Sequence, residues 1–258
     1  MKQPPNTIAP DSGAALWLEF PPHSKKRPER LLVFLHGAGS SPEMFAPVAL
    51  AWQFKFPGAT AILLEGLQQG FTGSGRDWFD PRLKGAEAAL EAGTAAREVA
   101  RRISSAQQSL GVSPEKTMLI GFSQGASMAL EVSRLGTAPA SITVSYAGRL
   151  LRPLSPGDAI RSTVHLVHGE FDTQVYAQNS QRAFRSLRDA GSTVSLDIVA
   201  DGIHSIGQDM INIGTTRAMQ TVFKQRKSIS VGQYHAALTL SLDSNQFADH
   251  EQTNRRSH

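Results

Sequence analysis

A five-residue segment near the middle of the chain constrains the fold more than any other feature. Residues 121–125 read Gly-Phe-Ser-Gln-Gly and fit the pattern G-x-S-x-G; they follow the apolar run Thr117–Ile120 and precede small and apolar residues of helical character. A serine in this setting lies on a sharp turn between a buried strand and a helix. The glycines fit because a side chain there would collide with nearby backbone. The sequence therefore predicts a strand–turn–helix unit with Ser123 presented at the bend, whereas the alternative is an ordinary glycine-bounded turn.

Apolar runs of strand length recur along the chain and alternate with helical patterns. Most of these runs are continuous, which is typical of strands buried on both faces. The predicted strands are Leu31–His36, Ala59–Leu64, Thr117–Phe122, Ser141–Tyr146, Thr163–His168 and Thr193–Val199, with an additional N-terminal strand over Leu16–Phe20. The alternation predicts an α/β fold with a mostly parallel central sheet and helices on both faces.

Helical periodicity fills the segments between these strands. Apolar residues recur at helical spacing from Val99 to Leu110, and Gly111 supplies a stop. A second helix follows Ser123 and ends near Gly136. Two more fit Tyr176–Ala190 and Met210–Lys227.

The length of 258 residues is compatible with one well-buried domain. We expect an N-terminal extension over residues 1–15, a single α/β domain over 16–228 and a polar, partly disordered tail over 229–258. No apolar run approaches a bilayer span, and the N-terminus lacks the features of a secretory signal, so we expect a cytoplasmic protein. Cysteine is absent, which excludes disulfides, thiolate metal sites and a thiol nucleophile.

The formal net charge of +4 and the pI near 9.6 raise the question of an anionic partner. The basic residues are dispersed, apart from short clusters at residues 25–27 and 224–227. A surface that binds single-stranded nucleic acid requires aromatic residues interleaved with the basic ones, and these clusters have none. We therefore expect no nucleic-acid partner.

A serine hydroxyl needs a base to remove its proton, and the base needs an orienting acid. His204 follows the strand Thr193–Val199 in a loop that leads into the last helix, so it is the predicted base. His36 and His168 each end a strand before a glycine and are interpreted as structural hydrogen-bonding residues. The histidines after residue 228 are set aside.

Asp172 is the predicted orienting acid. It follows the strand Thr163–His168, one strand before the histidine loop, and completes the chain order Ser, Asp, His that accompanies this type of serine turn. Glu170 and Asp201 are the nearby alternatives, and each carboxylate also fits a solvated loop position.

Acyl transfer at a serine also requires N–H donors for the oxyanion. The backbone N–H of Gln124 opens the predicted helix, where the partial positive charge of the helix end assists. The second predicted donor is the backbone N–H of Ala38, in the Gly-Ala-Gly loop after Leu31–His36. The alternative for that loop is a plain glycine-rich turn.

Taken together, these residues resemble the phospholipase/carboxylesterase family of α/β-hydrolases, which includes acyl-protein thioesterases. The resemblance rests on the Leu-His-Gly turn at 35–37, the serine pentapeptide, Trp-Phe-Asp at 78–80, His-Gly at 168–169 followed by Asp172, and Gly-Ile-His at 202–204. Residues 195–199 and a tail containing Tyr234 and His235 are most similar to small bacterial esterases of the YpfH type.

The resemblance implies that Trp78 and Phe79 line the acyl pocket and bind substrate, although a buried core position is an equally simple interpretation of Trp78. The chain departs from the family at Ser40 and Ser41, where an aspartate is frequent, and at Thr173, where a proline is frequent. These departures affect the expected shape of the oxyanion loop and the pocket.

The predicted function is a serine carboxylesterase that hydrolyses a small-molecule ester or thioester through an acyl-enzyme on Ser123, with no cofactor and no metal. Only residues 148–162 separate two successive strands, so no cap domain is expected, and the glycine-rich loop Gly66–Asp77 is the largest possible cover. Because the site is then relatively open, we expect substrates with short to medium acyl chains. The alternatives are a non-catalytic acyl- or aromatic-ligand-binding protein and a peptidase. Apolar residues at 16–20 fit either the core or a homodimer contact.

Overall fold

The computed structural model describes residues 17–23, 27–155, 157–158 and 160–227. The predicted N-terminal extension and C-terminal tail, with Tyr234 and His235, lie outside the described residues. The chain divides into two compact units, residues 1–218 and 219–258. The described part of the second unit, residues 219–227, is helical. Among the described residues, no helix combines the length and apolar character needed to cross a membrane.

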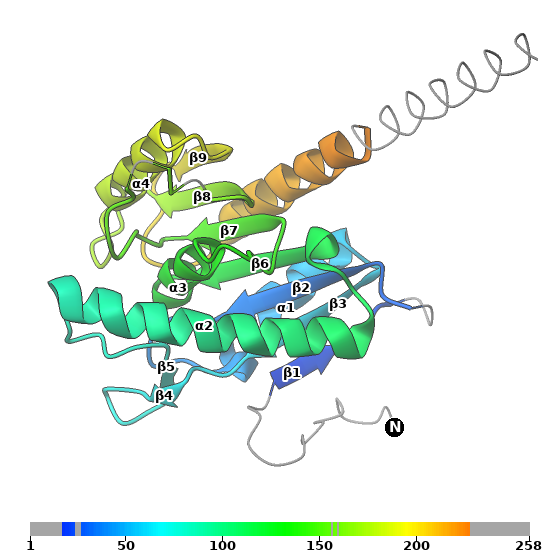
Figure 1. Cartoon of the computed structure of the whole chain (residues 1–258), viewed down its shortest axis with the longest axis horizontal. Helices are drawn as coiled ribbons and strands as arrows, with labels where there is room; N and C mark the ends of the chain where they lie inside the picture. The colour runs from blue at the N-terminus through cyan, green and yellow to red at the C-terminus, as the bar shows by residue number, and fades with distance from the viewer. Residues whose placement is uncertain (1–16, 24–26, 156, 159, 228–258) are drawn as a thin grey trace, which may run out of the picture. The chain divides into compact units, whose positions relative to one another are not determined.

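A seven-stranded sheet with the order β1-β3-β2-β6-β7-β8-β9 forms the centre of the first unit (Figure 1). Strand β1 pairs antiparallel with β3, and all the other neighbours are parallel. The strands are β1 (Trp17–Phe20), β2 (Arg30–Leu35), β3 (Ala59–Leu64), β6 (Thr117–Phe122), β7 (Ile142–Tyr146), β8 (Thr163–Gly169) and β9 (Val194–Val199). Each predicted strand begins and ends within one residue of the observed one, and the predicted mostly parallel α/β fold is confirmed.

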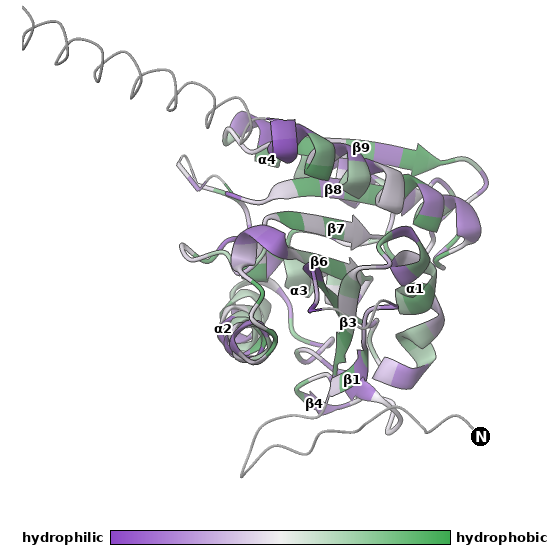
Figure 2. Cartoon of the chain, turned by 90° about the vertical axis from the view of Figure 1, so that its right-hand side faces the viewer, coloured by the Kyte–Doolittle hydropathy of each residue, from purple (hydrophilic) through white to green (hydrophobic). Residues whose placement is uncertain are grey.

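Helices lie on both sides of this sheet, with α1 and α2 on opposite faces (Figures 1 and 2). The helices are α1 (Pro42–Lys55), α2 (Gly85–Leu110), α3 (Gln124–Ser133) and α4 (Gln178–Asp189), and helical structure also begins at residue 208. Helix α2 buries Val99, Ile103 and Ala106 and ends at Leu110. Gly111 forms its C-cap in the left-handed conformation, with a φ of 64°, at the position where the sequence predicts a stop. Figure 2 shows hydrophobic residues along the strands and hydrophilic ones on much of α4.

Helix α1 was not predicted from the sequence. Its residues are apolar around most of the helix: Phe45, Ala49 and Trp52 are buried, while Met44 and Phe54 are largely exposed. No clear polar face interrupts this pattern, so helical periodicity is weak. Ser41 caps its first turn, because the Ser41 hydroxyl accepts the Met44 N–H at 3.4 Å.

The glycine-rich segment after β3 forms a short hairpin of β4 (Gln68–Gln69) and β5 (Arg76–Asp77). Arg76 also forms an isolated bridge with Ser40. At Gly75, where φ is +60°, an added Cβ atom would lie 2.7 Å from the Ser40 carbonyl oxygen. The hairpin therefore packs directly on the loop that follows β2, and only glycine permits this approach.

The connection between β7 and β8 contains no helix or strand in its described residues. A buried carboxylate ties it to α3: Glu131 accepts from Arg152 at 3.0 Å and lies 3.5 Å from the Arg134 guanidinium, which in turn donates to the carbonyl oxygen of Arg152. The short connection agrees with the expected absence of a cap insertion at this point.

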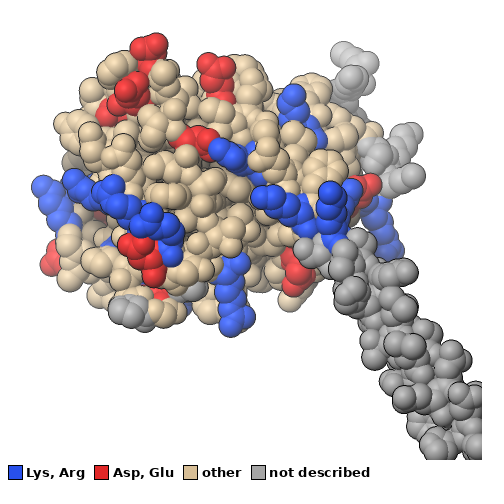
Figure 3. All heavy atoms as spheres, turned by 90° about the horizontal axis from the view of Figure 1, so that it is seen from above, with Lys and Arg blue, Asp and Glu red and all other residues tan. Residues whose placement is uncertain are grey.

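The surface seen in Figure 3 carries charges of both signs. Lys and Arg side chains are interrupted by Asp and Glu side chains and by uncharged surface. Several arginines of the described chain pair closely with carboxylates, among them Arg217 with Asp197 at 2.7 Å and Arg101 with Glu98 at 2.8 Å. The excess of basic residues is therefore partly balanced locally.

Candidate active site

Ser123 lies on a strained turn between β6 and α3. Its φ of 53° and ψ of −114° are rare for a residue with a side chain, and such strain costs on the order of 1–3 kcal/mol. The Ser123 N–H donates to the Tyr146 carbonyl oxygen at 2.9 Å, which fixes the turn to β7. Gly121 and Gly125 are required by space, because a Cβ atom at either would collide with backbone at Ala126 or Leu35. The predicted strand–turn–helix unit is thus present.

His204 reaches this serine from the loop after β9. Its Nε2 atom lies 2.9 Å from the Ser123 Oγ atom, although the two residues are 81 positions apart. The Phe122 ring packs against the imidazole with a centroid separation of 5.0 Å. The loop turns through Asp201, whose φ is 57°, so the Asp201 alternative belongs to the turn that aims His204 at the serine.

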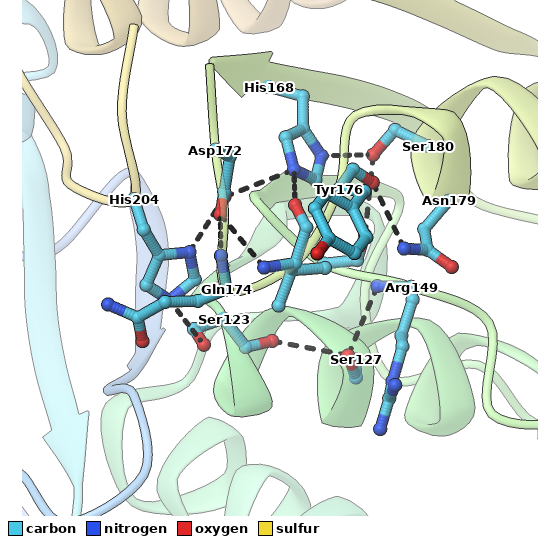
Figure 4. A network of polar contacts seen from close by, with 12 residues as sticks. Ser123, Ser127, Arg149, His168, Asp172, Gln174, Tyr176, Asn179, Ser180 and His204 are labelled. Carbon is cyan, nitrogen blue, oxygen red and sulfur yellow. Dashed lines mark hydrogen bonds and ion pairs between the residues drawn. The ribbon is translucent and has the colours of Figure 1, made fainter. Parts of the chain in front are cut away.

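Asp172 meets the other side of the His204 ring (Figure 4). Its Oδ2 atom lies 2.7 Å from His204 Nδ1, and its Oδ1 atom accepts the N–H groups of Gln174 and Val175 at 2.9 and 2.8 Å. Burial raises the pKa of Asp172, but the hydrogen bonds from His204 and these backbone groups outweigh burial and lower the pKa overall. The carboxylate is therefore ionised at neutral pH.

The ionised carboxylate decides where the His204 proton sits. Asp172 can only accept, so Nδ1 of neutral His204 carries the proton and donates it. Nε2 is then left unprotonated and accepts the Ser123 hydroxyl. This is the tautomer in which a histidine removes a proton from a serine.

His168 contacts the same carboxylate from a second direction (Figure 4). Its Nε2 atom lies 2.5 Å from the Val175 carbonyl oxygen and 3.2 Å from Asp172 Oδ2, while its Nδ1 atom lies 2.6 Å from Ser180 Oγ. A carbonyl oxygen accepts only, so Nε2 carries the proton and Nδ1 accepts the Ser180 hydroxyl. Burial lowers the pKa of His168 and keeps it neutral. The sequence indicated a structural histidine here but not its contact with Asp172.

The loop after β2, which carries one predicted oxyanion donor, comes close to Ser123, because a Cβ atom added at Gly37 would lie 3.6 Å from the Ser123 Cβ atom. Ser40 N–H donates to the Gly37 carbonyl at 3.3 Å, and Gly39 has a φ of 65°, so residues 37–40 form a tight turn with Ala38 at its exposed corner. Within the described residues the Ala38 N–H donates to no other group. The Gln124 N–H is the first of α3, a position without an intrahelical acceptor.

His36 supports this turn without contacting the triad. Its Nε2 atom accepts the Gly66 N–H at 3.2 Å, so Nδ1 carries the proton and donates to the Gly37 carbonyl at 2.7 Å. Burial lowers the pKa of His36 despite neighbouring acidic groups. These contacts agree with the structural role predicted from the sequence.

Trp78 and Phe79 are buried, with 1% and 5% of their surfaces exposed, and both belong to the main hydrophobic core cluster. The Trp78 indole N–H donates to the His36 carbonyl at 2.8 Å. The Gln124 side-chain amide bridges the backbones of these two residues. It accepts the backbone N–H of Trp78 at 2.9 Å and donates to the backbone carbonyl of Phe79 at 2.7 Å. Burial favours the core interpretation of Trp78, and substrate binding by these residues stays a prediction.

Two polar groups beside the site were not singled out from the sequence: the side-chain amide of Gln124 and the carboxylate of Asp77. Both make contacts across more than 35 positions of sequence. Their residue types alone carry no signal of such partners. Across the described residues, no group of three His, Cys, Asp or Glu side chains is arranged to hold a metal ion.

The sheet order, the strained serine turn after β6 and the histidine loop after β9 define the α/β-hydrolase fold. The chain belongs to the phospholipase/carboxylesterase family, whose family model matches residues 22–216. The family predicted from the sequence is therefore confirmed, and the chain is a hydrolase of the ester-hydrolysing class.

Individual relatives support this assignment. The esterase YpfH of Escherichia coli (strain K12) is 29% identical over 205 residues, which cover 77% of this chain and 86% of that protein. The crystal structure of esterase PE8 superposes with a TM-score of 0.72 at 27% identity, covering 78% of this chain and 96% of its own. A carboxylesterase from Mesorhizobium loti shares the fold with a TM-score of 0.70 at 18% identity, covering 83% of this chain and 99% of its own.

Proposed function

We propose that the protein is a serine carboxylesterase that hydrolyses short- to medium-acyl esters or thioesters through an acyl-enzyme on Ser123. One observation carries the proposal: an uninterrupted chain of contacts from Ser123 Oγ to His204 Nε2 at 2.9 Å and from His204 Nδ1 to Asp172 Oδ2 at 2.7 Å. A binding protein has no need of a serine held in a strained conformation against a correctly oriented base.

The first step is acylation. Ser123 Oγ attacks the carbonyl carbon while His204 Nε2 takes the hydroxyl proton, and the carbonyl electron pair moves onto oxygen. The N–H groups of Ala38 and Gln124 are the donors for that oxyanion. Asp172 stabilises the imidazolium that forms. When the oxyanion collapses, the bond to the alcohol or thiol breaks and His204 returns the proton to the leaving group.

The second step is hydrolysis of the acyl-enzyme. A water molecule enters on the side that the leaving group has vacated, and His204 Nε2 removes its proton as the water oxygen attacks the acyl carbon. The bond from that carbon to Ser123 Oγ then breaks, and His204 returns the proton to the serine. The acid is released and the enzyme is restored, with no metal or organic cofactor required.

The surroundings of the serine support small substrates. The described residues of the short connection between β7 and β8 form no helix or strand, and the hairpin after β3 spans only residues 68–77. Its loop carries Phe71, whose side chain is 59% exposed. An apolar side chain on a short loop suits an acyl chain of limited length better than a folded polypeptide.

The test compares p-nitrophenyl esters of increasing chain length with the matching amides, together with labelling by a fluorophosphonate probe. We expect saturable ester turnover, weak amide turnover and labelling of the wild type, with turnover and labelling lost in Ser123→Ala. Ser105→Ala, which removes an exposed hydroxyl from α2, is the matched control and retains both. A folded wild type that neither turns over esters nor reacts with the probe would refute the proposal.

A further inference from the structure

Asp77 is a buried carboxylate with an unusual set of partners. It ends β5, directly before Trp78, and only 2% of its surface is exposed. Its Oδ1 atom accepts the Gly39 N–H at 2.7 Å and its Oδ2 atom accepts the Phe71 N–H at 2.8 Å. Among the described residues it forms no ion pair. Burying a charge without a cation is costly unless hydrogen bonds compensate, so these two N–H groups are what holds the carboxylate there.

The Gly39 N–H belongs to the central peptide of the turn at residues 37–40. Gly39 is the third residue of this turn and has a positive φ, which accompanies one of the two orientations of the central peptide. In the flipped orientation the N–H and C=O of that peptide exchange positions. If it flipped, the Ala38 carbonyl would replace the Gly39 N–H opposite the Asp77 carboxylate. Two groups that only accept hydrogen bonds would then face each other. Asp77 therefore favours the observed orientation.

The hairpin reinforces this hold on the turn. The Gly39 N–H also reaches the Arg76 carbonyl at 3.0 Å, and the Arg76 N–H donates to the Ser40 carbonyl at 2.8 Å. Through its second oxygen Asp77 binds Phe71, so the hairpin tip and the turn share one anchor. Between His36 and Gly39 lies Ala38, whose N–H is unused within the described chain. The contacts on both sides determine where that N–H points.

We infer that Asp77 is a positioning residue for the oxyanion hole, holding the turn at residues 37–40 so that the Ala38 N–H faces the reacting carbonyl oxygen. The inference rests on the proposed function and deepens it. It concerns the oxyanion donors alone, because Asp77 makes no contact with Ser123, His204 or Asp172 among the described residues. Loss of Asp77 should therefore affect the stabilisation of the oxyanion and leave the serine–histidine pair in place.

The experiment uses Asp77→Asn, which keeps the shape of the side chain but opposes one backbone N–H with an amide N–H. Asp80→Asn is the matched control, because Asp80 lies three positions away and its carboxylate binds the exposed Arg82 side chain and backbone. Each variant is assayed with an ester and with the corresponding thionoester, in which sulfur replaces the carbonyl oxygen. Sulfur accepts hydrogen bonds weakly, so the oxyanion hole benefits the ester more.

We expect kcat on the ester to fall by about tenfold to a hundredfold in Asp77→Asn, since removal of a whole oxyanion donor costs about 10²–10³. The ratio of ester to thionoester rates should fall as well, with KM changed less than kcat. Asp80→Asn should resemble the wild type. Unchanged kcat in folded Asp77→Asn, or an equal loss on both substrates, would overturn the inference while leaving the proposed function intact.

A measurement on the wild type keeps the inference testable if Asp77→Asn fails to fold. Amide hydrogen exchange should show strong protection at Gly39 and fast exchange at Ala38, although both lie in the same turn. Fast exchange at Gly39 would overturn the role of Asp77. A wild type without ester turnover or probe labelling would instead overturn the proposed function, and this inference with it.

Discussion

His168 Nε2 lies 3.2 Å from Asp172 Oδ2, the same oxygen that accepts the hydrogen bond of His204. The carboxylate is thus held by one neutral histidine while it orients another. The Val175 carbonyl fixes the His168 tautomer, because it can only accept the Nε2 proton, and His168 Nδ1 then accepts the Ser180 hydroxyl. The orientation of Asp172 therefore depends in part on a fully buried side chain.

Replacing His168 should slow catalysis without abolishing it. In His168→Gln we expect kcat to fall by about tenfold, because small displacements of catalytic groups cost up to about 10². His168→Leu, which offers no N–H, should lose more. KM should change little. His165→Gln, on the same strand but with its ring against Ser195, is the control. Equal kcat values for the wild type and His168→Leu would show that backbone donors alone orient Asp172.

Asp172→Asn should reduce kcat by about 10³–10⁴, judged from the effect of the equivalent change in serine proteases. An amide N–H facing His204 Nδ1 would favour the opposite tautomer, in which Nε2 carries the proton and cannot accept the serine hydroxyl. Steady-state kinetics and the rate of fluorophosphonate labelling measure the loss. The exposed Asp189→Asn on α4 serves as the control. Labelling at the wild-type rate would contradict the orienting role.

The pH dependence of stability follows from the lowered pKa values of His36 and His168. Because each folded-state pKa lies below the unfolded value near 6.5, the unfolded chain binds more protons as the pH falls past about 6.5. The free energy of unfolding should therefore decrease as the pH falls from about 7.5 to about 5.5. Thermal melts of His36→Gln should show a smaller decrease over this range, whatever its absolute Tm. A slope equal to that of the wild type would mean that His36 accepts a proton readily in the folded protein.

Gln124→Leu should destabilise the protein by about 1–3 kcal/mol, since it leaves the Trp78 N–H and the Phe79 carbonyl buried without partners. Urea denaturation measures the change. Gln108→Leu, at an exposed position of α2, is the control and should differ little from the wild type. A stability equal to that of the control would indicate that water or another group replaces the amide.

Much of the sheet was predictable because its central strands are buried on both faces and most of them consist largely of apolar residues. The proximity of Ser123, Asp172 and His204 was also predictable, since each follows a strand and the carboxyl ends of parallel strands meet at one edge. Helix α1 was missed because apolar residues cover both its buried and exposed sides. Periodicity carries no signal in that case.

Contacts between residues far apart in the sequence could not be predicted from hydrophobic periodicity or motifs. The sequence of the hairpin β4–β5 is typical of a glycine-rich loop. Its bridge from Arg76 to Ser40 depends on how β2 and β3 place the loops that follow them. In the sequence Asp77 cannot be distinguished from other polar loop residues, and only the fold shows its contact with Gly39. Trp78 fits a pocket or a core equally well in the sequence, and only its burial separates the two.

The separation of the proposed triad along the chain links the proposed activity to the completion of folding. Ser123 and His204 are 81 positions apart, and Asp172 precedes His204 by 32. Contacts between such distant segments form only after much of the chain entropy has been lost. An intermediate that contains β2, β3, β6 and β7 but lacks β8 and β9 has the serine turn without Asp172 or His204 in place. Recovered esterase activity would thus be a stringent reporter of refolding, one that partly assembled chains cannot mimic.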